Sequence, residues 1–119
     1  MEIVHLILGK ANPNRMNGVN KFVHQMASKQ KEQGRNVSVW GISENTDRNF
    51  EERNFETKIF KREPGRFSIN EKLKTAIIAT TNKTVFHLHG GWVPLNYALA
   101  MFLKKNHKEY VITPHGAYN

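Results

Sequence analysis

Two histidine-glycine pairs follow apolar runs, and they are the residues whose types and spacing best suit chemistry. They occur in VFHLHGGW and YVITPHG, and the residues concerned are His89, Gly90, Gly91, Trp92, His115 and Gly116. An imidazole exchanges protons near neutral pH, and an adjacent glycine lets a ligand approach the backbone. Because His115 follows a Thr-Pro that ends an apolar run, we expect its ring to point into a cleft and to serve catalysis.

The HGGW segment offers two interpretations. Its His89, Gly90, Gly91 and Trp92, together with Gly116, are candidates for substrate binding. Alternatively, the two glycines make a tight turn from strand to helix, Trp92 packs, and His89 is a hydrogen-bonded core residue. For His89 the sequence favours this second, structural role.

The other histidines are weaker candidates for a functional role. His87 lies two residues before His89 and on the same face of the expected strand. Two imidazoles without a nearby carboxylate or cysteine make a weak zinc site, so we expect neither a metal nor a cofactor. His5 within a strand, and His24 and His107 within helices, are more typical of structural or solvated side chains.

A third glycine-containing loop, GKANPNRMNG, follows the first apolar run and ends in Asn17 and Gly18. At the start of a helix, free backbone N–H groups attract an anion such as a phosphate, so both residues are substrate-binding candidates. A simple cap and turn explains them equally well. The loop matches neither the dinucleotide-binding nor the P-loop glycine pattern, so the sequence does not support nucleotide binding in those two modes.

The elements that must position these loops alternate along the chain. Strands are predicted over 2–8, 36–42, 55–61, 84–89 and 109–114. One helix is predicted from Val19, with Gly34 after its last turn; a capping box at Ser68 to Glu71 opens a second, and Pro94 starts a third. This alternation predicts an α/β fold with a doubly wound parallel sheet of order 3-2-1-4-5. The carboxyl ends of the strands would then bring the three loops to one edge.

Composition limits the classes of function. The chain has 119 residues, no cysteine and a formal net charge of +8. No disulfide scaffold or thiolate metal site is possible, and without a signal peptide or a membrane span the chain reads as cytoplasmic. The positive charge favours an anionic partner. The lysines and arginines are spread over several elements without a nucleic-acid motif, so we expect no nucleic acid.

Taken together, IVHLIL, NGVNKFVHQMA, VFHLHGGW, PLNYALAMFLKK and YVITPHG resemble the N-terminal half of a retaining glycosyltransferase of GT-B architecture, in the large family four. The resemblance covers essentially all 119 residues. It implies a Rossmann-like, acceptor-side lobe of a two-lobed enzyme that moves a sugar from a nucleotide-sugar donor to a saccharide, lipid or other acceptor. A C-terminal donor-binding lobe would be absent from residues 1–119.

The resemblance also implies roles for single residues. Gly18 would approach the pyrophosphate of the donor or a phosphate of the acceptor, and His115 would contact the transferring sugar. Asn17 stands where many members of the family have glycine. Because the chain stops soon after its fifth expected strand, we expect an incomplete lobe that is inactive alone.

The alternative is a non-enzymatic basic module that binds anionic ligands or an anionic membrane surface. The residues that would form its basic surface are Lys58, Lys61, Arg62, Arg66, Lys72, Lys74, Lys104, Lys105 and Lys108. Peripheral contact with the inner face of a membrane is equally open for the enzyme.

Overall fold

A computed structural model of the chain contains one five-stranded sheet and three helices, and it describes residues 1–12, 18–90 and 93–114. The elements in chain order are β1 (Glu2–Leu8), α1 (Gly18–Glu32), β2 (Asn36–Ser43), β3 (Glu56–Lys61), α2 (Glu71–Ile78), β4 (Thr84–His89), α3 (Pro94–Lys105) and β5 (Glu109–Thr113). All the predicted strands and helices are present.

The sheet is entirely parallel, with the order β3-β2-β1-β4-β5. This confirms the predicted α/β class and the Rossmann-like doubly wound order. The chain returns to the middle after β3, so β1 and β4 are neighbours across the point where the winding reverses. Their register pairs His5 with His87.

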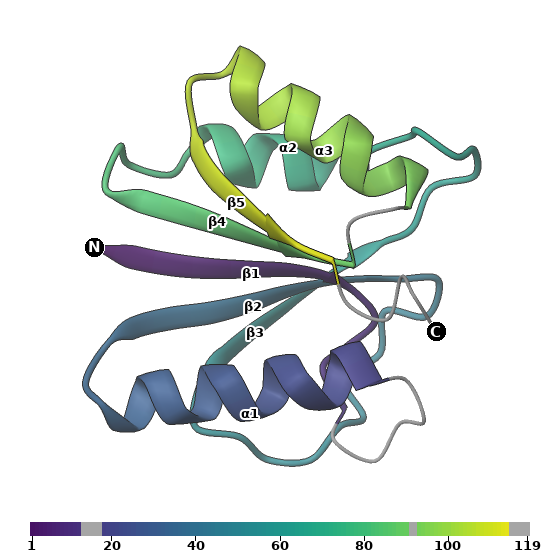
Figure 1. The fold of residues 1–119 in the computed structure, drawn as a ribbon. Coiled ribbons are helices and arrows are strands. Elements are labelled where there is room, and N and C mark those ends of the chain that lie inside the picture. Colours follow the sequence, from purple (N-terminus) through teal and green to yellow (C-terminus); the bar gives the residue numbers. More distant parts are fainter. Residues whose placement is uncertain (13–17, 91–92, 115–119) are drawn as a thin grey trace.

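Helix α1 lies on one face of the sheet, and α2 and α3 lie on the other (Figure 1). The face under α2 and α3 is the larger core, made of Val4, Leu6, Trp40, Ile42, Leu73, Ile77, Phe86, Leu88, Leu95, Leu99 and Leu103. The face under α1 is made of Ile7, Ala11, Val23, Ala27, Val37, Val39 and Phe55. Alternation along β1 therefore sends Val4 and Leu6 to the larger core and His5 and Ile7 to the α1 side.

The helix boundaries follow local chemistry. Gly34, with a φ of +83°, lies two residues after the end of α1 at Glu32, as predicted. Pro94 occupies the start of α3, where its missing N–H costs nothing.

The predicted capping box at Ser68 is wrong. Helix α2 begins at Glu71, and its N-cap is Asn70, whose side-chain oxygen accepts hydrogen bonds from the backbone N–H groups of Lys72 (2.8 Å) and Leu73 (3.3 Å). The Asn70 amide also donates to a Glu63 carboxylate oxygen at 3.2 Å. Asparagine caps as well as serine does, and here this second contact fixes its orientation.

Candidate functional site

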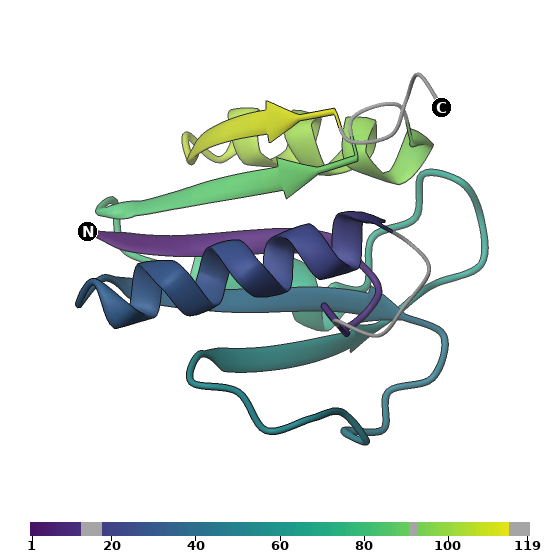
Figure 2. The ribbon, with the colours of Figure 1, turned by 60° about the horizontal axis from the view of Figure 1, so that its bottom comes forward.

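The carboxyl edge of the sheet gathers the strand ends and the first turns of the helices. All five strands run in one direction, so α1 and α3 both begin at the edge where β1 and β4 end (Figures 1 and 2). Neither α1 nor α3 carries an acidic side chain in its first turn, whereas α2 begins with Glu71. The positive ends of α1 and α3 are therefore not compensated by acidic residues of their own first turns.

The loop after β1 is tied to α1 by Asn20. The Asn20 side chain is buried, and its oxygen accepts a hydrogen bond from the Ala11 backbone N–H at 2.9 Å. A Cβ at Gly9, whose φ is +120°, would overlap that same amide. Ala11 is fully buried and has a φ of +55°, an uncommon conformation for a residue with a side chain. Such a conformation, held by its surroundings, is often found at functional sites.

Gly41 lets the loop after β1 pass close to the backbone of β2. A Cβ at Gly41 would overlap the carbonyl oxygen of Gly9 and lie 3.2 Å from the Ile59 side chain. The Gly9 N–H also donates to the Ile42 carbonyl at 2.8 Å. Close backbone approach between β2 and the chain leaving β1 therefore requires glycine at position 41.

Charged residues of the segment between β2 and β3 hold the same loop from outside. The largely buried Lys10 donates to the Asp47 carboxylate at 3.0 Å and to the Asp47 carbonyl at 2.7 Å. The Lys10 hydrogen bond lowers the pKa of the Asp47 carboxyl, with a contribution from the Asn49 N–H. Arg53 donates to the Lys10 carbonyl at 2.8 Å.

Sequence reasoning missed Lys10, in the loop after β1, and Asp47 and Arg53, in the polar segment between β2 and β3, because no local pattern marks the contacts between these two segments. The signal that could have marked them is a lone lysine directly after a buried strand. By contrast, Glu51 and Glu52 in the same segment are exposed, as their polar surroundings indicate.

The end of β4 is fixed by a buried asparagine of α3. The Asn96 side chain donates to the His89 carbonyl at 2.9 Å, and the Gly90 N–H donates to the Thr113 carbonyl of β5 at 2.9 Å. Gly90 has a φ of +105°, which only glycine adopts readily. The strand therefore turns sharply at Gly90, as the HGGW pattern indicates.

His89 is a buried, hydrogen-bonded residue, as its preferred interpretation predicts. It is 2% exposed, and its Nε2 lies 2.9 Å from Nδ1 of His5. Nε2 of His5 lies 2.8 Å from the side-chain oxygen of Gln30 in α1. His87 stacks on His89 with ring centroids 4.0 Å apart, and its Nε2 is 2.6 Å from the Thr113 hydroxyl.

Three of the predicted site residues lie within the described chain, namely Gly18, His89 and Gly90. Gly18 is the exposed first residue of α1, and no described atom lies within 4 Å of a Cβ placed there. The residues that lie outside the described part are Asn17, Gly91, Trp92, His115 and Gly116. The catalytic role predicted for His115 stays a prediction.

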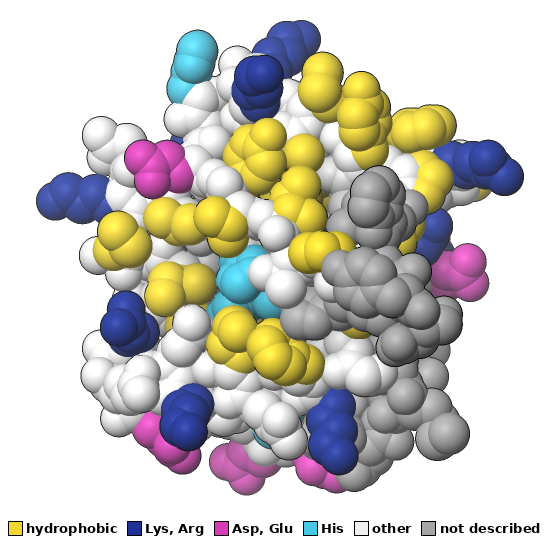
Figure 3. Space-filling model, viewed as in Figure 1, with side chains coloured by type: hydrophobic (Ala, Val, Ile, Leu, Met, Phe, Trp, Pro, Cys, Tyr) yellow, Lys and Arg dark blue, Asp and Glu magenta, His cyan; other side chains and the backbone are white. Residues whose placement is uncertain are grey.

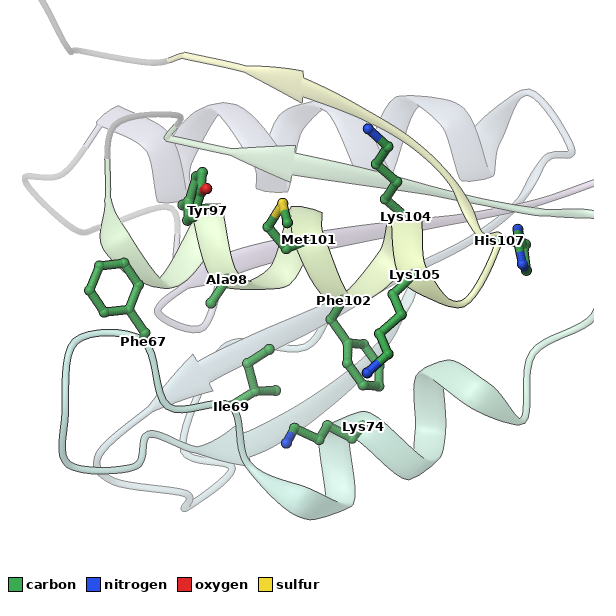
Figure 4. Close-up of a pocket in the computed structure, with 10 residues that line it drawn as sticks. All are labelled: Phe67, Ile69, Lys74, Tyr97, Ala98, Met101, Phe102, Lys104, Lys105 and His107. Carbon is green, nitrogen blue, oxygen red and sulfur yellow. The ribbon is translucent and has the colours of Figure 1, made fainter.

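A separate groove of about 790 Å³ runs along α3 (Figure 4). Its lining residues are Phe67, Ile69, Lys74, Tyr97, Ala98, Met101, Phe102, Lys104, Lys105 and His107. Phe67, Tyr97 and Met101 are all more than half exposed. The groove thus combines exposed apolar side chains with three lysines.

Among the helices of the described residues, none is long and apolar enough to cross a bilayer. No protein-family model, curated protein or solved structure matches the chain in the three comparisons that we made.

Proposed function

We propose that residues 1–119 are the N-terminal, acceptor-side lobe of a retaining nucleotide-sugar glycosyltransferase of GT-B architecture. The observation that carries the proposal is the convergence of glycine-containing loops and uncompensated helix starts at the carboxyl edge of a sheet of order 3-2-1-4-5. This is the edge at which open α/β sheets bind ligands. The resemblance of VFHLHGGW and YVITPHG to the family adds the reaction type.

The chemistry of such a transfer suits this edge. When the sugar leaves its nucleotide, negative charge develops on the diphosphate, and helix starts and cations stabilise that charge. In this proposal Gly18 at the start of α1 faces a phosphate of the donor or the acceptor. The net charge of +8 raises the local concentration of such anions. His115 is the proposed contact to the transferring sugar.

Position 18 allows a test that separates function from stability. Gly18→Ala adds a methyl group where no described atom lies within 4 Å, so the fold should tolerate it. Gly18→Asp adds an acidic side chain to the first turn, which stabilises a helix by about 0.3–1 kcal/mol but repels a phosphate. Both variants should therefore unfold at or above the wild-type midpoint, while sugar transfer falls strongly, most in Gly18→Asp.

Transfer must be measured on the chain joined to its donor-binding lobe, because the lobe alone is expected to be inactive. The encoding reading frame downstream of Asn119 should continue into a second Rossmann-like pattern. A stop codon directly after Asn119, or sugar transfer catalysed by residues 1–119 alone, would contradict the proposal. So would full transfer activity in Gly18→Asp.

The groove along α3 favours a second candidate function, the binding of an anionic membrane surface. Aromatic and methionine side chains can insert at the headgroup boundary while lysines bind anionic lipids. Lys104 and Lys105 are exposed in the last turn of α3, and the groove also contains Lys74.

Vesicle co-sedimentation tests this candidate. The Lys104→Glu/Lys105→Glu variant should bind phosphatidylserine-containing vesicles roughly 30-fold less tightly at low salt, because each lysine near the surface contributes about 1 kcal/mol. The matched control is Lys29→Glu/Lys31→Glu, which changes the charge equally in the last turn of α1, on the opposite face of the sheet. An equal loss of vesicle binding in both variants would rule out a specific contact. So would wild-type binding to purely zwitterionic vesicles that is as tight as its binding to phosphatidylserine-containing vesicles.

A further inference from the structure

Three imidazoles meet on the α1 side of the sheet, next to the point where the winding reverses. His5 in β1 pairs in register with His87 in β4, and His89 lies two residues further along the same face. One nitrogen from each ring lies within 4.8 Å of the other two. We call these three residues the histidine cluster.

The spacing of these nitrogens is close to that of a tetrahedral metal site. With Zn–N bonds of about 2.0–2.1 Å, two ligand nitrogens lie about 3.4 Å apart. Nδ1 of His5 and Nε2 of His89 are already 2.9 Å apart. Binding an ion would therefore release the hydrogen shared by His5 and His89 as a proton and separate these two nitrogens slightly. It would also require His87, whose ring now stacks on His89, to rotate toward the other two nitrogens.

Two of the three rings have the outer partners that metal-binding histidines use. Nε2 of His5 faces the Gln30 oxygen at 2.8 Å, so this nitrogen carries the hydrogen and Nδ1 keeps its lone pair for a ligand bond. His87 has the Thr113 hydroxyl at 2.6 Å from Nε2. Such contacts fix the tautomer and the orientation of a ligating ring.

Burial sets the direction from which an ion can reach the cluster. His5 and His89 are buried, whereas His87 is partly exposed. In Figure 3 a histidine surface lies between hydrophobic side chains at the centre of the face where β4 and β5 meet α1. An ion would therefore arrive from the His87 side.

We propose that His5, His87 and His89 bind one divalent transition-metal ion of the zinc class, with Gln30 and Thr113 as positioning residues. Neutral imidazoles suit Zn²⁺, Co²⁺, Ni²⁺ and Cu²⁺, whereas Mg²⁺ and Ca²⁺ prefer oxygen ligands. Three protein nitrogens leave a fourth position for water or a small anion. The proposal concerns this face of the sheet and does not depend on sugar transfer.

The test is Zn²⁺ binding by the untagged chain, measured by metal analysis after dialysis and by titration calorimetry. We expect one Zn²⁺ per chain, a Zn²⁺-dependent rise in the unfolding midpoint, and the absorption of four-coordinate Co²⁺ when Co²⁺ replaces Zn²⁺. His87→Ala, at the most exposed ring, should weaken binding at least about 100-fold, and Gln30→Ala about 10–100-fold.

The matched control is His107→Asn, which removes an exposed histidine outside the cluster. His107 has a φ of +58°, which asparagine tolerates, so this variant should fold and bind Zn²⁺ as the wild type does. Should His87→Ala unfold, His87→Phe keeps a ring stacked on His89. Absence of Zn²⁺ binding by the wild type, or unchanged binding in a folded His87 variant, would show that the cluster is only a hydrogen-bonded part of the core.

Discussion

Replacing Gly41 by alanine should destabilise the protein severely, because the loop after β1 crosses this residue. A Cβ at position 41 would overlap the Gly9 carbonyl oxygen, at a separation well below the roughly 3.3 Å of a close C···O contact. It would also press on the Ile59 side chain at 3.2 Å. Relief requires β1 or β2 to move, and both strands lie in the centre of the sheet with helices on both faces.

Overpacking of a filled core costs typically about 1–3 kcal/mol, and occasionally more. Because the overlap at Gly41 involves a backbone atom that no side-chain rotation can move, we expect a loss of about 3 kcal/mol. For a chain of this length such a loss lowers the unfolding midpoint by roughly 10–15 °C. Thermal and urea unfolding, followed by circular dichroism, measures both quantities.

The matched control is Gly18→Ala, the same chemical change at a glycine with no described neighbour around its would-be Cβ. Its stability should remain within about 0.5 kcal/mol of the wild type, or rise slightly. If Gly41→Ala were as stable as Gly18→Ala, the close approach of the first loop to β2 would not be a constraint. The loop geometry derived from it would then be wrong.

Three further predictions concern polar groups in the interior. Asn20→Ala should cost about 1–3 kcal/mol in urea unfolding, because the buried Ala11 N–H loses its acceptor. Burial, and to a lesser extent the Arg53 guanidinium, lower the pKa of His24. The contribution of His24 to stability should therefore fall as pH drops below about 6.5, by at most about 1.4 kcal/mol per pH unit, and His24→Gln should show a shallower overall fall. Trp40→Phe should change stability by less than about 1.5 kcal/mol. The buried indole N–H has no hydrogen-bond partner among the described residues, so its removal is favourable and offsets the packing that the smaller ring loses.

The topology could be predicted from the sequence because each element carries a local signal. The apolar runs, the helical spacing, Gly34 and Pro94 are all short-range patterns, and the alternation of strands and helices leaves few ways to wind a parallel sheet. The predicted start of α2 was wrong because serine and asparagine cap helices equally well. In the structure Asn70 is the cap, and its side-chain amide also contacts Glu63, which no local pattern indicates.

The candidate site was less predictable, because its supports come from distant segments. Arg53 donates one hydrogen bond to the Lys10 carbonyl over 43 positions of sequence, and no local pattern marks that pairing. His5 looked like an isolated strand histidine, yet it lies beside His89, 84 positions away. Only the parallel register of β1 and β4 brings them together, and that register was not part of the prediction.

The same register makes the two proposals separable. In the metal-free chain a hydrogen bond between His5 and His89 ties the end of β4 to β1, so loss of stability in a His5 variant cannot distinguish the two roles. His87 can, because its ring is partly exposed and its removal leaves that hydrogen bond in place. Gly18 is the first residue of α1 and is not a ligand in the proposed metal site, so its variants test phosphate binding. A protein in which Gly18→Asp abolishes transfer and His87→Ala abolishes Zn²⁺ binding would therefore contain two independent sites on one sheet.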